Sequence, residues 1–209
     1  METKDYLHFI VHEIHTTVVA TVDDAGLPVT CAIDMMDNDE NSLYFLTAKG
    51  KNFYERLKKR RYLSLTGMKG EDTMSRVAVS VQGKVRELGR EMVTELFRKN
   101  PYMYDIYPDE SSRSAISVFQ IYEGSGEWFD LSKKPVERAN FNFGGAENIS
   151  GGYFITDKCT GCETCYFKCP QKCIDISHKP VFINQSNCLH CGNCFEICPA
   201  HAVVKRRLL

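Results

Sequence analysis

The sequence predicts an α+β protein, with a small antiparallel β-barrel in the first two thirds of the chain and a compact cysteine-rich domain after it. Three observations support this prediction. Short runs of β-branched and aromatic residues alternate with turn signals before residue 140, two segments among them have helical spacing, and nine of the ten cysteines lie after residue 158. Six or so short antiparallel strands favour a barrel, because a closed sheet leaves no strand edge exposed.

The predicted strands are rich in Val, Ile, Thr and aromatic residues, the types that favour extended backbone. Asp-Asp-Ala-Gly-Leu-Pro follows the first strand and Asn-Asp-Glu-Asn-Ser precedes the third, so both hairpins contain residues that favour turns. We expect strands at residues 16–22, 29–36, 42–48, 62–68, 76–88 and 114–124.

Two amphipathic helices are expected between the strands. Residues 51–61 place Phe53, Tyr54 and Leu57 at helical spacing. Residues 91–100 form a second helix, which Pro101 ends. Four glycines near residues 140–152 indicate a linker. The predicted organisation is therefore a barrel domain at 1–139, a glycine-rich linker at 140–152 and a cysteine-rich domain at 153–209.

Composition limits the classes of partner. The net charge of -1 gives no reason to expect nucleic acid or an anionic membrane. The N-terminal residues lack the basic start and apolar core of a signal peptide, and no apolar run is long enough to span a bilayer. We therefore expect a cytoplasmic protein that binds neither nucleic acid nor membrane.

The cysteines form two cassettes. CTGCETCYFKCP occupies residues 159–170, and CLHCGNCFEICP repeats the spacing 29 positions later, at residues 188–199. In a cytosolic protein such regular spacing indicates a metal site more strongly than disulfides. Structural zinc, which also takes four thiolates, is the alternative. Zinc needs neither the middle cysteine of each cassette nor a partner from the other cassette.

Residues 153–205 resemble the bacterial two-cluster 4Fe–4S ferredoxins in this repeated C-x2-C-x2-C-x3-C-P spacing, in which the fourth cysteine of each run ligates the other cluster. The resemblance implies an electron-transfer module that folds around inorganic clusters. Cys173 fits neither ligand set and is predicted to be a small buried residue. The implied ligands are Cys159, Cys162, Cys165 and Cys198 for one cluster, and Cys188, Cys191, Cys194 and Cys169 for the other.

Two other groups of residues stand out before the cassettes, and the sequence assigns no role to either. His8, His12 and His15 include the sequence His-Glu-Ile-His, which is one residue short of the H-E-x-x-H metal motif. We interpret these histidines as surface or internally paired side chains. Residues 100–110 contain three tyrosines, which are interpreted as core or interface packing.

A loop after the third strand has the composition of a phosphate site. Thr47 supplies a hydroxyl, Lys49 and Lys51 supply positive charge, and Gly50 allows close approach of a ligand. The helix that begins near Asn52 adds backbone amides at its N-terminus, which favour anions.

Residues 5–130 resemble the FMN-binding split-barrel family that includes the pyridoxamine 5′-phosphate oxidases. The resemblance rests on VATVDDAGLP, on the strand that ends in Leu46 and Thr47, on the lysine-bearing loop, and on YLSLTG. It implies a six-stranded split barrel that binds FMN non-covalently, as a homodimer with the flavin at the subunit boundary. The phosphate would meet Thr47, Lys49 and Lys51, and the ring would lie along the second strand. The implied cofactor-binding residues are Cys31, Ala32, Ile33, Asp34, Leu46, Thr47, Lys49, Gly50 and Lys51.

The second strand departs from the oxidases in one respect. They carry an arginine and a lysine five residues apart, at positions that correspond to Cys31 and Met36 here. The resemblance is therefore closer to reductase-like members of the family than to enzymes that oxidise vitamin B6.

Together the two halves predict an FMN-dependent reductase with its own ferredoxin domain. Two 4Fe–4S clusters and FMN would pass electrons to a small organic acceptor, because a flavin exchanges electrons in pairs and a cluster exchanges them singly. The electron donor or acceptor is expected to be a redox protein or a small molecule. Two alternatives remain: an electron carrier whose flavin relays charge between proteins, and a barrel that binds another ligand such as haem.

Overall fold

The computed structural model of the chain describes residues 1–147 and 151–206 and contains two compact units. The first unit comprises Met1–Lys69, Ala78–Glu127 and Phe141–Glu147. The second comprises Gly70–Val77, Trp128–Asn140 and Asn148–Leu209. No helix in the described ranges has both the length and the apolar character needed to cross a bilayer.

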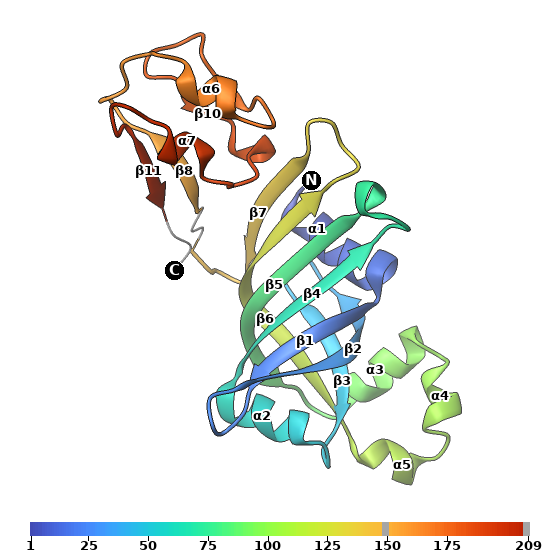
Figure 1. Cartoon of the computed structure of the whole chain (residues 1–209). Helices are drawn as coiled ribbons and strands as arrows, with labels where there is room; N and C mark the ends of the chain where they lie inside the picture. The colour runs from blue at the N-terminus through green and yellow to red at the C-terminus, as the bar shows by residue number, and fades with distance from the viewer. Residues whose placement is uncertain (148–150, 207–209) are drawn as a thin grey trace. The chain divides into compact units, whose positions relative to one another are not determined.

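Six antiparallel strands close into a barrel (Figure 1), which confirms the predicted α+β fold with a six-stranded barrel. The strand order is β3-β2-β1-β4-β5-β6, and pairing of β3 with β6 closes the sheet. A seventh strand, β7, pairs with β6. The strands are β1 (Thr16–Val22), β2 (Pro28–Asn38), β3 (Leu43–Ala48), β4 (Tyr62–Lys69), β5 (Val77–Glu87), β6 (Ile116–Asp130) and β7 (Glu137–Phe143).

Alternating burial explains why these segments form a barrel. In β1, Thr17, Val19 and Thr21 are buried while the side chain of Val18 between them is exposed. This period of two places one row of side chains in the core and the other in contact with solvent. Asp23 ends the strand, because its Oδ1 accepts hydrogen bonds from the backbone amides of the following turn, and the chain reverses into β2.

The helices of the first unit cover the barrel ends and one outer face. In α2, Phe53 and Leu57 lie one turn apart and are both buried. In α3, Leu96 and Phe97 are fully buried against side chains of β2 and β6, including Met36. The helices are α1 (Thr3–Phe9), α2 (Asn52–Arg60), α3 (Glu91–Lys99), α4 (Met103–Ile106) and α5 (Glu110–Ser114), with a π-helix η1 (Ile10–Ile14) directly after α1.

The second unit contains the cysteine cassettes and very little regular structure. Its elements are the 3-10 helices η2 (Thr73–Ser75) and η3 (Gln185–Asn187), the paired strands β8 (Gly152–Ile155) and β11 (Val203–Arg206), the paired strands β9 (Ile174–Asp175) and β10 (Phe182–Ile183), and the helices α6 (Thr164–Lys168) and α7 (Asn193–Glu196).

The two cassettes share a backbone conformation as well as a sequence spacing. Positive φ angles occur at matched positions 29 residues apart, in the three pairs Gly161 and His190, Glu163 and Gly192, and Lys172 and His201. The first two pairs shape the loops that carry the first cysteines of each cassette. The repeat inferred from the cysteines is therefore a repeat of local structure.

The structure differs from the sequence-based expectation mainly around residue 140. Residues 137–143 form β7, whereas the sequence suggested that a linker begins at residue 140. The glycines that suggested a linker follow this strand, with Gly144 and Gly145 at positive φ. Residues 148–150 of the expected linker lie outside the described residues.

Candidate functional site

The eight cassette cysteines surround two separate cavities. One cavity is lined by Cys159, Cys162 and Cys165 of the first cassette together with Cys198 of the second. The other is lined by Cys188, Cys191 and Cys194 together with Cys169. The structure therefore brings together the same two crossed sets of thiols that the ferredoxin resemblance implies, and each set combines both cassettes.

Short helices and loop amides position these thiols. Helices α6 and α7 bury Cys165 and Cys194, the third cysteine of each cassette. The amide of Gly161 donates to Sγ of Cys159 at 3.4 Å, and the amide of His190 donates to Sγ of Cys188 at the same distance. Such hydrogen bonds orient cluster ligands and tune a cluster's potential.

All ten cysteines are free thiols. Within the described ranges, no three Cys, His, Asp or Glu side chains lie close enough together to hold a single metal ion. Thiols spread around a cavity suit a cubane, because each of its irons takes one cysteine. The donor set and its arrangement therefore fit 4Fe–4S clusters.

Cys173 lines the second cavity beside the four predicted ligands. It is buried, as expected for a small side chain, and its Sγ lies 3.5 Å from Sγ of Cys169. The spacing of the cassettes did not predict this contact. Cys173 follows the predicted ligand Cys169 by four residues, and the turn of chain between them brings the two thiols together.

In the barrel, strands β2 and β3 separate where the flavin ring is expected. Residues 28–34 of β2 pair with β1, but pairing of β2 with β3 begins only at Met35, after which a bulge interrupts the register. Residues 46–48 of β3 pair with β6. In the described ladders, residues 28–34 of β2 and residues 46–48 of β3 therefore do not pair with each other. The backbone groups along these facing edges are free, and they are suited to bind a flat ligand with polar edges.

Thr47 carries a buried hydroxyl with an unmet hydrogen-bonding requirement. The residue is 4% exposed, and its Oγ1 has no hydrogen-bond partner in the described part of the chain. Its cross-strand neighbour Ser117 donates instead to Glu87 at 2.7 Å. A buried polar group without a partner is costly, so the Thr47 hydroxyl fits a site that a ligand completes.

The loop after Thr47 places positive charge near the same strands. Lys51 is the N-cap of α2 and gives no side-chain cap, so the amides of Asn52 and Phe53 at the start of this nine-residue helix remain open to an anion, while the amide of Tyr54 donates to the carbonyl oxygen of Lys51. The backbone amide of Lys49 donates a hydrogen bond to the carbonyl oxygen of Ala115, which fixes the position of this residue. Its Nζ lies 3.4 Å from the carbonyl oxygen of Ser114. A Cβ added at Gly50 would meet no atom within 4 Å, so space remains there for a ligand.

Residues 31–34 of β2 alternate between the two faces of the sheet. Cys31 and Ile33 pair with inward-facing residues of β1, whereas Ala32 and Asp34 lie on the outer face. Burial raises the pKa of Cys31, and the positive charges of Arg56 and Lys51 oppose this shift. The guanidinium of Arg56 in α2 and the ammonium of Lys51 at its N-cap therefore both act on this strand.

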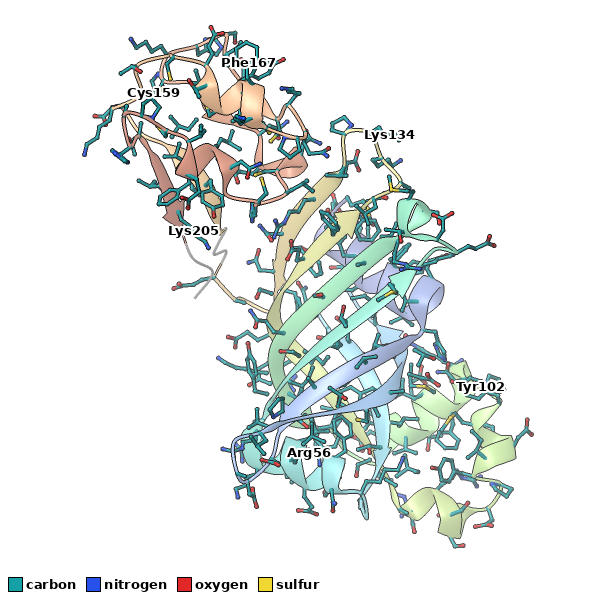
Figure 2. The ribbon with its side chains drawn as sticks, viewed as in Figure 1. Arg56, Tyr102, Lys134, Cys159, Phe167 and Lys205 are labelled. Carbon is teal, nitrogen blue, oxygen red and sulfur yellow. The ribbon has the colours of Figure 1, made fainter. Side chains whose placement is uncertain are left out.

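Arg56 was missed by sequence reasoning. Its Nε donates a hydrogen bond to Oγ1 of Thr21 at 2.8 Å, and this bond fixes Arg56, labelled in Figure 2, beside the barrel end. The available signal was its place one turn into the helix that follows the lysine loop. Leu46, by contrast, lies on the opposite face of β3 from Thr47. It packs against the buried side chains around Leu96 and Phe97 of α3, away from the lysine loop.

The N-terminal histidines separate into two groups. The rings of His8 and His12 lie 4.1 Å apart between centroids. His15 faces Tyr102 and Asp34 instead. The His-Glu-Ile-His sequence therefore does not bring its two histidines to one point.

Comparison with known proteins matches a family model to each half of the chain. The sequence model of the pyridoxamine 5′-phosphate oxidase family matches residues 3–123, more than half of the chain. The model of the 4Fe–4S dicluster domain matches residues 152–199. Pyruvate synthase subunit PorD of Methanothermobacter marburgensis is 41% identical over 51 residues, which are 24% of this chain and 59% of that protein. The chain thus spans little more than half the length of this relative.

Three solved structures share the barrel fold. A NimC/NimA family protein from Clostridium acetobutylicum has a TM-score of 0.57 at 17% identity, covering 68% of this chain and 92% of its own. A protein related to general stress protein 26, from the same organism, gives 0.52 at 18% identity, with 66% and 94% covered. A heme binding protein from Mycobacterium smegmatis gives 0.53 at 12% identity, with 70% and 62% covered.

At these identities the three structures establish the fold alone. The sequence models go further, because one covers residues 3–123, from α1 into β6, and the other covers both cysteine cassettes. Through residues 3–123 the chain belongs to the pyridoxamine 5′-phosphate oxidase family, and a 4Fe–4S dicluster domain follows its split barrel.

Proposed function

We propose that the protein is a flavin- and iron–sulfur-dependent oxidoreductase in which two 4Fe–4S clusters exchange electrons with FMN, and that it reduces a small organic acceptor. One observation carries the proposal: crossed sets of four thiols surround two cavities in the same chain as a barrel of an oxidase family. The division of the chain into a barrel domain and an iron–sulfur domain is part of this proposal.

The cluster ligands are proposed to be the two crossed sets. Cys162 and Cys191 are exposed, whereas the third cysteines Cys165 and Cys194 are buried. Electrons can therefore enter or leave each cluster near an exposed cysteine. The relation to PorD, a subunit of a pyruvate synthase by name, supports a redox protein as the donor; a small molecule is the alternative donor.

The FMN phosphate is proposed to bind at the start of α2. The hydroxyl of Thr47, the ammonium groups of Lys49 and Lys51, and the guanidinium of Arg56 supply the hydrogen bonds and charge. The free edge of β2 over residues 31–34 holds the ring. When bound, FMN supplies hydride chemistry toward the acceptor and single-electron exchange toward the clusters.

A second copy of the chain is the proposed partner of the barrel. Exposed apolar side chains lie on the outer faces of β1 and β4, among them Val18, Val22, Tyr62 and Met68. Exposed apolar side chains gathered on one sheet face mark an interaction surface. A homodimer through this face agrees with the family's usual assembly.

An anaerobic reductive titration tests the proposal. Iron, sulfide and flavin are assayed on one purified sample, and visible absorbance is followed as electrons are added. About eight irons and one FMN per chain, reoxidised by an organic acceptor, support the reductase. Reoxidation by redox proteins alone supports an electron carrier. Iron without flavin removes the flavin from the proposal, and haem in its place supports the third alternative.

A further inference from the structure

The imidazole of His15 faces two polar side chains from distant parts of the chain. Its Nε2 lies 3.2 Å from the hydroxyl oxygen of Tyr102 and 3.6 Å from Oδ2 of Asp34. Asp34 lies on β2, and Tyr102, labelled in Figure 2, directly precedes α4. All three residues belong to the first unit. Three elements thus converge on one acid–base cluster.

The backbone of His15 is held in a rare conformation. Its φ of 62° and ψ of -68° are those of a γ-turn with positive φ, which residues with a Cβ seldom adopt. The His15 amide closes the π-helix by donating to Ile10 at 2.9 Å, and its carbonyl accepts from the amide of Met35 at 2.9 Å. Both π-helical turns and strained residues are concentrated at functional sites.

Strand β4 makes room for this conformation. A Cβ at Gly67 would lie 2.6 Å from Cγ2 of Ile14, the last residue of η1. The glycine therefore allows the π-helix to pack against β4 and places the next residue, His15, beside β2. The strained geometry is supported from two sides of the barrel.

The partners of His15 are themselves oriented. Oδ1 of Asp34 accepts a hydrogen bond from Oγ1 of Thr16 at 2.6 Å, which turns Oδ2 toward the imidazole. Burial, and then the charge of Asp34, raises the pKa of Tyr102, so its hydroxyl keeps its proton at neutral pH. The His15 side chain is 39% exposed, which leaves the ring within reach of a small molecule.

Other titratable groups near the cluster are engaged elsewhere. His12, on η1, lies against His8 with the two rings tilted by 34°; its pKa is lowered by burial and then by the charge of His8. Asp37, farther along β2, pairs with Lys99 of α3 at 2.5 Å. Asp34 is therefore the carboxylate that faces His15.

We infer that His15 is the proton donor for the reduction of a conjugated carbonyl compound bound beside β2, with Asp34 and Tyr102 as positioning residues. This inference rests on the proposed function, because Asp34 is the last residue of the β2 segment assigned to the flavin ring. The acceptor's β-carbon takes a hydride from the reduced flavin, and its α-carbon takes the proton of the His15 imidazolium. The C=C π bond breaks, two C–H bonds form, the flavin is oxidised, and His15 regains a proton from water.

The test compares two oxidants of the reduced, fully loaded protein. 2-Cyclohexenone needs one hydride and one proton, whereas ferricyanide takes single electrons and needs no proton donor. His15→Gln should slow reoxidation by cyclohexenone about 100-fold or more, the usual contribution of a general acid, and should leave reoxidation by ferricyanide unchanged. His8→Gln, on the same N-terminal segment but outside the cluster, is the matched control and should behave like the wild type.

A readout without turnover separates catalysis from structure. Adding cyclohexenone to the oxidised protein should shift the imidazole 15N resonances of His15, identified by their loss in His15→Gln, and not those of His8. Equal cyclohexenone rates in wild type and His15→Gln would overturn the inference. The inference would also be overturned if ferricyanide reoxidised the wild-type protein and cyclohexenone did not. The proposed electron transfer would still be supported in that case. A wild type that neither reagent reoxidises would overturn the proposed function and the inference with it.

Discussion

The sulfur atoms of Cys169 and Cys173 lie 3.5 Å apart at the edge of the cavity that Cys188, Cys191 and Cys194 also line. Cys173 is thus a fifth thiol beside a proposed cluster with four ligands. Its S–H can donate to the Cys169 sulfur, and hydrogen bonds to ligand sulfurs stabilise the more negative, reduced cluster.

Removing this thiol should lower one reduction potential without removing iron. We expect Cys173→Ala to keep about eight irons and to lower the potential of one cluster by about 20 to 60 mV, the equivalent of one hydrogen bond of about 0.5–1.5 kcal/mol. A redox titration followed by EPR measures this shift. Cys31→Ala, in the barrel, is the control. Loss of four irons from Cys173→Ala would instead make Cys173 a ligand.

The crossed ligand sets predict a specific pattern in double variants. Cys198→Ala should remove about half of the iron, because it empties one set of four. Adding Cys159→Ala should remove no more, since both residues belong to the same set. Adding Cys188→Ala should remove the rest. Iron analysis distinguishes this pattern from uncrossed ligation, in which Cys198 and Cys188 would behave as members of one set.

Thr47 offers a test of the flavin site in which binding and stability change in opposite directions. Its Oγ1 is buried without a partner in the described ranges, so Thr47→Val should leave the flavin-free barrel as stable or slightly more stable. FMN affinity should fall about tenfold, the effect of about 1.4 kcal/mol. Thermal unfolding and flavin titration measure the two effects. An unchanged FMN affinity would place the phosphate elsewhere.

Two glycines should respond differently to the same substitution. Gly67→Ala would bring its Cβ to 2.6 Å from Ile14, and such overpacking costs about 1–3 kcal/mol. Gly50→Ala meets open space and should leave the free energy of unfolding unchanged, but it should weaken FMN binding if the phosphate lies against this loop. Chemical denaturation of the flavin-free protein and flavin titration check both statements. A stable Gly67→Ala protein would mean that η1 can shift without cost.

The lowered pKa of Glu87 predicts that the barrel loses part of its stability in acid. Burial tends to raise its pKa, but hydrogen bonds from Lys58, Ser117 and Tyr54 outweigh burial, and the net pKa is lowered from 4.5. A lowered pKa in the folded state stabilises the protein above the unfolded value, and this contribution disappears as pH falls through the folded pKa.

The wild type should therefore lose more stability than Glu87→Gln as pH falls below about 4.5. At pH 7 the variant should be about 2–3 kcal/mol less stable, since charged hydrogen bonds of a partly buried group are lost. Denaturant unfolding at several pH values gives the difference curve. Glu123→Gln, at a pair with Lys84 on the outer surface, controls for acid damage to the clusters. A flat difference curve would contradict the prediction.

Local patterns predicted most of the barrel and the cofactor class. The alternation in residues 16–22 is a property of neighbouring residues, as is the C-x2-C-x2-C spacing, so both are visible without tertiary structure. Closure of the sheet was expected because an open sheet of short strands would leave its edges exposed, and the family resemblance supported this expectation.

The features that were missed depend on contacts between distant residues. The position of Arg56 beside Thr21 needs the helix to be docked on β1. The strained backbone of His15 follows from packing of η1 against Gly67 and from the hydrogen bond to Met35. In strand β7 only Phe141 and Phe143 are buried, at the end of the strand, and the glycines that follow made this short alternation resemble the start of a linker.

The matched positive φ angles in the two cassettes bear on how the second unit assembles. Each cassette supplies three thiols to one cavity and a single thiol to the other, and the two halves share positive φ angles at matched positions. A duplicated half-domain would have this form. With the proposed crossed ligand sets, neither copy completes a cubane by itself, and each is half of the other's binding site. We therefore expect the pair to be the smallest piece of this chain able to hold a four-thiolate cluster.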